Sequence, residues 1–314
     1  MAARVSLYLV TGGAGFIGSH LCDALIARGD TVRVLDDLST GKRENLPAGV
    51  EPIVGDVADP ETAFRAAAGI DGCFHLAAIA SVERGMNDWL GAHRANLTGA
   101  ISVFDAIRRH ASKIPVVYAS SAAVYGDCRT IPIPESAGKR PLSSYGADKL
   151  GCEQHAAVAT HAHGIPTAGL RFFNVYGPRQ DPKSPYSGVI SIFGERILSG
   201  APVNIYGDGQ QTRDFIHVFD VAAALLAAMA AVPRDAPAFN VCTGRATSVA
   251  GLAAIIGDLA GKTPDIAFLP PRSGEIRHSL GDPSKGRQAL GLGTPLGLRE
   301  GLATVLAALG QSRS

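Results

Sequence analysis

Short apolar runs alternate with segments of helical periodicity over the first 170 residues of the chain. The apolar runs predict strands at Val5–Val10, Thr31–Asp36, Val50–Val54, Gly72–Leu76, Pro115–Ser120 and Thr167–Phe172. The segments between them predict helices at Gly15–Arg28, Pro60–Ala68, Gly91–His110 and Tyr145–His163. Strict alternation of strand and helix indicates a parallel sheet that is covered on both faces. The expected fold class is therefore α/β, with a doubly wound parallel sheet.

The pattern changes after about Arg171, where proline and glycine become frequent and predict long loops that shape a pocket. Further on, the sequence predicts a return helix at Asp220–Met229 and a short strand at Phe239–Val241. A smaller C-terminal substrate-binding lobe would contain Ser248–Ala260, Asp265–Asp282 and Leu298–Leu309. We divide the chain into 1–171 with a return segment at about 214–242, and a lobe made of 172–213 and 243–314.

Composition narrows the classes of partner. The 314 residues contain 29 Lys and Arg against 28 Asp and Glu, and this balance favours neither a nucleic-acid nor a membrane-surface partner. No apolar run reaches the length of about 18 residues that a membrane span needs, and no signal peptide pattern opens the chain. Five scattered cysteines without a C-x-x-C pair predict reduced thiols in the cytoplasm, and we assign no metal site.

A glycine-rich turn follows the first predicted strand. Gly13, Gly15 and Gly18 fit the G-x-G-x-x-G pattern between a strand and a helix, which is the context that this pattern requires. Glycines allow the backbone to approach a pyrophosphate, and the free N–H groups of the helix bind its charge. The turn therefore predicts a dinucleotide site in a Rossmann-type sheet.

An acidic residue at the end of the second strand indicates which dinucleotide binds. Asp36 lies 18 residues after Gly18, where a ribose-binding carboxylate is expected. Such a carboxylate accepts bonds from both ribose hydroxyls and repels a 2′-phosphate, so NAD is favoured. Lys42 and Arg43 follow closely and leave NADP open. Asp56, after the third strand, is a candidate for the adenine contact.

Tyr145 and Lys149 lie four residues apart at the start of a predicted long helix, and so share one face of it. A nearby ammonium favours the phenolate form of a tyrosine. A phenolate can take a proton from a substrate hydroxyl while hydride leaves the same carbon for a nicotinamide. The location of the pair after a strand that ends in Ser120 and Ser121 strengthens this catalytic interpretation.

Together these motifs carry a family resemblance. TGGAGFIGSH, Asp36, HLAA at His75–Ala78, SSAAVYG at Ser120–Gly126, the Tyr145/Lys149 pair, RFFNVYGPR at Arg171–Arg179 and IYGDGQQTRDFIHV at Ile205–Val218 resemble the extended short-chain dehydrogenase/reductase superfamily. Within that superfamily the chain is most similar to the nucleotide-sugar 4-epimerases of the UDP-glucose/UDP-galactose type. The resemblance covers nearly the whole chain.

The resemblance implies residues for each part of the site. NAD would contact Gly12, Gly15, Phe16, Ile17, Gly18, Asp36, Asp37, Ser39, Thr40, Gly41, Asp56, Val57, Leu76, Ala77, Ala78, Asn96, Ser120, Tyr145, Lys149 and Phe172. The catalytic residues would be Ser121, Tyr145 and Lys149. The UDP-sugar would contact Ser121, Asn174, Val189, Arg213, Arg272, Glu275 and Ser279. In this set the two arginines clamp the diphosphate and Glu275 holds the uridine-side ribose.

Two alanines indicate which reaction of the family the chain performs. Related dehydratases and decarboxylases carry carboxylates at the positions of Ala122 and Ala123, where they act on neighbouring carbons. Without them, the remaining groups suffice for oxidation and re-reduction at one carbon, which favours an epimerase with a 4-keto intermediate. A one-way NAD(P)-dependent reductase or dehydrogenase with the same Tyr/Lys pair remains an alternative, and a non-catalytic dinucleotide sensor is a third.

The identity of the sugar depends on a second pocket. A bulky tyrosine is common at the position of Ser279 in epimerases restricted to simple hexoses, so the serine leaves room for an N-acetyl group. Arg277 and His278 are close enough in the sequence to reach a glucuronate carboxylate, so a UDP-glucuronate 4-epimerase stays open.

Departures from the family pattern are Ala119, Ser144 and Phe172, where serine, proline and tyrosine are frequent. The family also implies a homodimer through helices at about 91–110 and 145–163.

Overall fold

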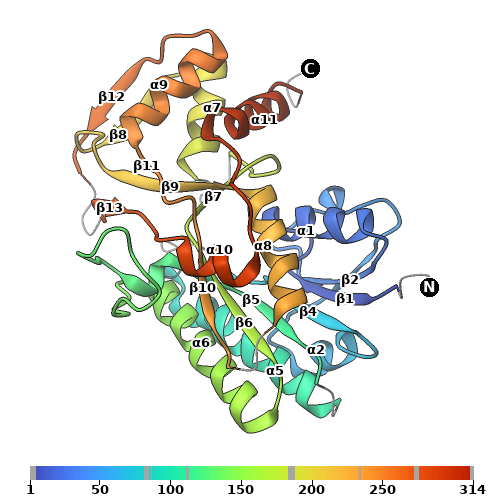
Figure 1. Cartoon of the computed structure of the whole chain (residues 1–314). Helices are drawn as coiled ribbons and strands as arrows, with labels where there is room; N and C mark the ends of the chain where they lie inside the picture. The colour runs from blue at the N-terminus through green and yellow to red at the C-terminus, as the bar shows by residue number, and fades with distance from the viewer. Residues whose placement is uncertain are drawn as a thin grey trace.

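The computed structural model describes residues 5–311 apart from 81–84, 86, 111–112, 183–187, 233–234 and 272–275. Two layers of helices enclose a central sheet, and a smaller lobe lies beyond the end of that sheet (Figure 1). No helix in these described ranges has both the length and the apolar character needed to cross a membrane.

The central sheet has seven strands in the order β10-β6-β5-β4-β1-β2-β3, and every neighbouring pair is parallel. Its strands are β1 Leu7–Thr11, β2 Thr31–Asp36, β3 Pro52–Val54, β4 Gly72–His75, β5 Val116–Ser121, β6 Thr167–Phe172 and β10 Ala238–Val241. The predicted fold class is confirmed. The strand order reverses between β1 and β4, and a crevice is expected there, outside the carboxyl ends of the strands.

Apolar faces of helices cover both sides of this sheet. Helices α1 Phe16–Ala27 and α8 Val218–Ala231 share one buried cluster with α10 Ser284–Leu290. Helices α2 Pro60–Ala66, α5 Gly99–Arg109 and α6 Ser144–His163 bury their apolar residues in a second cluster on the other face. Burial of each strand from both sides explains the near-continuous apolar strands of the sequence.

The helix predicted over Gly91–His110 is divided into three parts. Helix α4 Trp89–His93 leads into the π-helical turn η2 Arg94–Thr98, and α5 follows. Inside the π turn, the Asn96 side chain accepts a hydrogen bond from the Ile79 amide at 2.7 Å and is 1% exposed. Such turns concentrate at functional sites, and here the turn directs Asn96 at the segment that follows β4.

The smaller lobe contains more regular structure than the sequence predicts. Strands β7 Asn174–Tyr176, β9 Thr212–His217, β11 Ala246–Ser248 and β13 His278–Ser279 form one sheet, and β8 Val203–Tyr206 pairs with β12 Ile266–Leu269. Helices α7 Val189–Ser199, α9 Val249–Ala260 and α11 Leu298–Gln311 pack around a third cluster. The prediction of long loops was wrong for α7, where Ile190, Phe193 and Ile197 are buried at helical spacing.

Two short 3-10 turns, η1 Arg43–Asn45 and η3 Ala122–Tyr125, follow β2 and β5 at the crevice. Within the expected return segment of about 214–242, α8 packs on the central sheet and β10 joins it. Residues 214–217 instead belong to β9 in the small sheet.

Candidate active site

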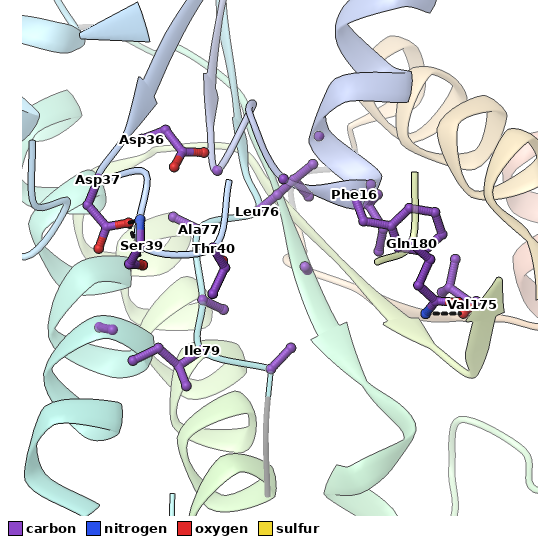
Figure 2. A pocket seen from close by; sticks show the side chains of 18 of the residues that line it. Phe16, Asp36, Asp37, Ser39, Thr40, Leu76, Ala77, Ile79, Val175 and Gln180 are labelled. Carbon is purple, nitrogen blue, oxygen red and sulfur yellow. Dashed lines mark hydrogen bonds between the residues drawn. The ribbon is translucent and has the colours of Figure 1, made fainter. Parts of the chain in front are cut away.

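A cavity of about 820 Å³ lies at the carboxyl ends of β1, β2, β4, β5 and β6 and extends to β7. Figure 2 shows Asp36, Asp37, Ser39 and Thr40 at one end of it with Ala77 beside them, Phe16, Val175 and Gln180 at the other end, and Leu76 between the two groups. Its size is that of ordinary ligand sites, about 300–1,000 Å³. The predicted residues that line it are Gly12, Gly15, Phe16, Ile17, Gly18, Asp36, Asp37, Ser39, Thr40, Asp56, Val57, Leu76, Ala77, Ala78, Ser121, Tyr145, Phe172 and Asn174.

The glycine turn is shaped by close backbone contacts. Gly12 has φ +69°, and a Cβ there would stand 2.7–2.9 Å from the backbone of Leu76 and Ala77. A Cβ on Gly18 would collide with the Gly12 carbonyl oxygen. Gly15 is the N-cap of α1 and no side chain caps the helix, so its first N–H groups face the cavity without an internal acceptor. This cradle fits a pyrophosphate.

Asp36 is fixed at the end of β2 and is 7% exposed. Its Oδ2 accepts a hydrogen bond from the Ala14 amide at 3.0 Å, and its Oδ1 accepts one from the Leu38 amide at 2.9 Å. Burial raises the pKa of this carboxyl, and the two amides oppose the rise. Each oxygen retains acceptor capacity, so the group suits the two hydroxyls of a ribose.

The adenine end is bounded by Asp56, whose carboxylate is already engaged. Oδ1 accepts from the Ala58 amide at 2.8 Å, and Oδ2 accepts from Nε and a terminal nitrogen of Arg94 at 3.1 and 2.9 Å. Gly41 does not line the cavity, but a Cβ there would be 2.7 Å from the Asp36 carboxylate. Glycine at this position therefore supports the placement of Asp36.

Two of the candidate catalytic residues line the same cavity. Ser121 ends β5 and Tyr145 lies in the first turn of α6, and both line the cavity. The Ser121 hydroxyl accepts a bond from the Ala123 amide at 3.1 Å and keeps its own proton to donate. Ser143 caps α6 by accepting from the Gly146 amide at 3.1 Å, which fixes the helix start beside Tyr145.

Lys149 lies directly behind this wall. It is 1% exposed, and its Nζ is 5.9 Å from the centroid of the Tyr145 ring and donates to the Ala119 carbonyl at 2.8 Å. The Lys149 side chain is therefore packed beside the ring of the candidate base. Asn96, another residue expected to contact NAD, does not line the cavity either.

Ser120 differs from the expectation that it contacts the cofactor. It is 1% exposed, it does not line the cavity, and its hydroxyl donates to Glu153 Oε1 at 2.6 Å. Successive residues of a strand point to opposite faces, so Ala119 and Ser121 face the cavity while Ser120 points away. The Ser120 side chain is therefore turned away from the cavity in which a cofactor would lie.

The predicted substrate residues are dispersed. Asn174 lines the cavity, whereas Val189 packs against the core of the smaller lobe. Arg213 and Ser279 are paired residues of β9 and β13, beyond the cavity wall. Arg272 and Glu275 lie outside the described residues.

A segment of the smaller lobe supplies lining residues that the sequence reasoning missed, namely Phe173, Val175, Gln180 and Asp181. The Gln180 side chain donates to the Val175 carbonyl at 3.5 Å (Figure 2). It also accepts from the Ser191 hydroxyl at 2.8 Å. The available signal was the motif at Arg171–Arg179, which contains Phe173 and Val175 and directly precedes Gln180 and Asp181.

Comparisons with known proteins agree with this geometry. Residues 8–242 match the sequence model described as the NAD dependent epimerase/dehydratase family. The chain is 36% identical over 301 residues to the UDP-glucose 4-epimerase of Mycolicibacterium smegmatis, covering 94% of this chain and 96% of that protein.

Two solved structures are similar over almost their whole length. One is a UDP-glucose 4-epimerase of Thermus thermophilus in complex with NAD, with TM-score 0.90, 37% identity, and 97% and 99% of the two chains covered. The other is a UDP-N-acetylglucosamine 4-epimerase of Methanobrevibacter ruminantium in complex with UDP-N-acetylmuramic acid, with TM-score 0.92, 35% identity, and 98% and 99% covered.

Proposed function

The chain belongs to the NAD dependent epimerase/dehydratase family, and we propose that it is an NAD-dependent 4-epimerase of UDP-sugars. One observation carries the proposal: Ser121 and Tyr145 line the same cavity as the glycine turn and Asp36, with Lys149 buried behind them. A dinucleotide bound along the turn would thus end beside an acid–base pair. The related epimerases of M. smegmatis and T. thermophilus support the same activity.

The residues present fit NAD better than NADP. Gly12, Gly15 and Gly18 would hold the pyrophosphate, and Asp36 the adenosine ribose. Lys42 and Arg43, the bases that could favour a 2′-phosphate, pair with Asp181 at 3.0 Å and Glu51 at 2.9 Å. When bound, NAD supplies reversible hydride acceptance at the sugar's C4.

The chain's own groups move the proton. Tyr145, as phenolate, takes the proton of the 4-hydroxyl, and the Ser121 hydroxyl stabilises the same oxygen by a hydrogen bond. Lys149 holds the charge of the phenolate through space. For inversion, the 4-keto sugar would turn about its diphosphate link so that the opposite face of C4 meets the bound cofactor for return of the hydride, while Tyr145 returns the proton to the 4-oxygen.

Acid groups are placed where they do not promote elimination or decarboxylation. Among the described residues that line the cavity, the carboxylates are Asp36, Asp37, Asp56 and Asp181. The segment from Ser121 to Tyr145 contributes none, and Ala122 and Ala123 occupy the positions next to the serine. Chemistry at a neighbouring carbon would need a second acid–base group there.

For the substrate, we assign the diphosphate to Asn174, Arg213 and Arg272, the uridine ribose to Glu275, and the sugar to Ser121. Ser279 is paired in register with Arg213, and we assign its small side chain to the border of the same ligand. This supports acceptance of an N-acetylhexosamine as well as a hexose, as does the likeness to the UDP-N-acetylglucosamine 4-epimerase of M. ruminantium.

The uronate alternative has less support. The two terminal nitrogens of Arg277 donate to the two carboxylate oxygens of Asp208 at 2.8 and 2.7 Å. His278 shares a hydrogen bond with the Thr212 hydroxyl at 2.9 Å. Both candidate partners of a glucuronate carboxylate therefore already have hydrogen-bond partners.

We also propose a cytoplasmic homodimer. Helices α5 and α6 lie side by side on one face of the sheet (Figure 1), and Ile101 and Val158 expose apolar side chains on them, at 36% and 54%. A second copy would cover these groups.

All five cysteines are free thiols, which fits a reducing compartment such as the cytoplasm.

Mass spectrometry of the purified protein and a panel of UDP-sugars test the function. We expect one retained NAD per chain and interconversion of UDP-glucose and UDP-galactose without net formation of reduced cofactor. Tyr145→Phe should lower kcat at least about 100-fold, the usual contribution of a general base, while NAD stays bound. Stoichiometric NADH formation without an epimer would instead support the dehydrogenase alternative, and full activity of Tyr145→Phe would overturn the assignment.

A further inference from the structure

Helix α6 presents three functional side chains along one face. Tyr145, Lys149 and Glu153 are spaced four residues apart, so they align along the helix. Opposite them, β5 ends in Ala119, Ser120 and Ser121. Two runs of three residues are thus set against each other, with Tyr145 and Ser121 at the cavity.

Two direct bonds connect these runs. Lys149 Nζ donates to the Ala119 carbonyl at 2.8 Å, and the Ser120 hydroxyl donates to Glu153 Oε1 at 2.6 Å. The lysine chain is long and flexible and bonds a single carbonyl oxygen, so it tolerates sliding of the helix. The contact between Ser120 and Glu153 is short, largely buried and charge-assisted, and it tolerates much less sliding of the helix.

Arg171 on β6 makes the glutamate rigid. Its Nε donates to Glu153 Oε1 at 2.8 Å and a terminal nitrogen donates to Oε2 at 2.7 Å, with the two side chains 4% and 10% exposed. The other terminal nitrogen donates to the Tyr125 hydroxyl at 2.8 Å and to the Glu135 carbonyl at 3.1 Å. Glu153 is therefore held in one orientation by β6 while it receives Ser120 from β5.

We propose that Ser120 and Glu153 are positioning residues that set the register of α6 against β5, and thereby the place of the Tyr145 hydroxyl relative to Ser121. The proposal rests on the proposed function, because it concerns the two groups that share the sugar's 4-oxygen. It also gives Ser120 a role other than the cofactor contact expected from the sequence. A tyrosine shifted along the cavity wall would still leave the dinucleotide and diphosphate sites intact.

The test is Ser120→Ala in the full-length protein, because it removes the bond and leaves the buried pair of Arg171 and Glu153 intact. We expect kcat per NAD-loaded site to fall roughly tenfold, since a misplacement of about 1 Å can cost about 100-fold. KM for the UDP-sugar and the NAD content should stay within twofold. Ser120→Thr keeps the hydroxyl and should restore kcat to within threefold of wild type.

Thr160→Val is the matched control. Its hydroxyl also fastens α6 to the sheet, by donating to the Ile165 carbonyl at 2.7 Å and pairing with the Thr167 hydroxyl at 2.8 Å, but at the far end of the helix. We expect a lower unfolding temperature with kcat per loaded site unchanged. An equal loss of kcat in the control would reduce Ser120 to a general stabilising residue.

Two other results would also overturn the proposal: unchanged kcat in Ser120→Ala, or lost NAD with normal kcat per loaded site, which would make Ser120 a cofactor contact. Failure of the proposed function looks different, because wild type itself would then form no epimer. In that case the rate of sugar oxidation by the same variants provides the comparison, since it needs the same placement of Tyr145.

Discussion

At the scale of single residues, burial decides the charge of His75, the last residue of β4. The side chain is 2% exposed, its Nδ1 shares a hydrogen bond with the Thr11 hydroxyl at 2.8 Å, and its Nε2 has no partner in the described part of the chain. Burial lowers the pKa of His75 to about 3, and the charge of Lys149 adds to the effect. The imidazole is therefore neutral at neutral pH.

This neutrality predicts a loss of stability in mild acid. Because the pKa is about 3 in the folded protein and 6.5 in the unfolded chain, the unfolded state binds more protons as the pH falls below 6.5. At about pH 5 the free energy of unfolding should be lower by about 2 kcal/mol from this residue alone. Thermal unfolding of wild type and His75→Phe at neutral pH and at about pH 5 measures the difference.

His155→Gln is the control, since His155 is an exposed histidine on α6. It should keep the acid sensitivity of wild type, and His75→Phe should lose part of it. An equal fall in unfolding temperature for all three proteins would show that His75 does not titrate on unfolding.

Single residues also differ most in how well the sequence predicts their roles. The roles expected for Tyr145 and Asp36 follow from a helical spacing and a strand end, and both side chains line the cavity. Ser120 and Ser121 are chemically identical neighbours, and only the direction of β5 tells which one faces the ligand. That direction depends on the register with α6 and β6, which a single sequence does not contain.

At the scale of elements, the glycine turn and helix α1 together form one anion-binding site. The Gly18 position is in contact with the Gly12 carbonyl, so the helix can begin only where the turn allows it. The uncapped N-terminus of α1 then faces the cavity. Anion binding here depends on both features at once.

Gly18→Ala should therefore abolish retention of NAD. The added Cβ collides with backbone, which cannot move as a side chain can, so the turn must open. We expect the purified variant to contain less than about a tenth of the wild-type NAD, on the scale of a lost interaction of more than about 1.4 kcal/mol. Quantification of NAD released from denatured protein measures this.

Gly138→Ala is the matched control, because a Cβ there meets nothing within 4 Å. Its NAD content should equal that of wild type. Normal NAD content in Gly18→Ala would mean that the turn does not hold the cofactor.

Element boundaries were predictable where one local signal dominates. The alternation of strand and helix up to β6 follows from apolar runs between turn residues. The π turn inside the helix of 91–110 does not, because it depends on the bond between Asn96 and a segment that precedes it in the chain. Helix α7 was hidden for another reason: its flanks are rich in glycine and proline, which dominated the interpretation of the region.

At the scale of the whole molecule, polar contacts connect the smaller lobe to the Rossmann unit across the cavity. Asp181 pairs with Lys42 at 3.0 Å, and Arg179 pairs with Asp23 at 2.7 Å. His20 shares a hydrogen bond with the Pro178 carbonyl at 3.0 Å, and burial lowers the pKa of this histidine. Of these contacts, the pair of Lys42 and Asp181 joins two residues of the cavity wall itself.

An epimerase that regenerates its cofactor in each turnover gains from slow release of NAD, and a bridge over the cavity slows release. Lys42→Ala should therefore increase the rate of NAD dissociation about two- to fivefold, which is what an exposed ion pair of about 0.5–1 kcal/mol allows. Added salt should accelerate release from wild type toward the rate of the variant, because the two side chains are 48% and 37% exposed and the pair is screened. Exchange of bound NAD against a fluorescent analogue gives the rate directly.

Arg43→Ala is the control that separates bridging from charge. It removes the same charge from the neighbouring residue, but Arg43 pairs with Glu51 and does not line the cavity. If the bridge acts by joining the lobes, Arg43→Ala releases NAD at the wild-type rate, and Asp181→Asn reproduces Lys42→Ala. If both basic residues matter equally, the effect is long-range attraction of the cofactor's phosphates, and the contact between the lobes has no part in retention.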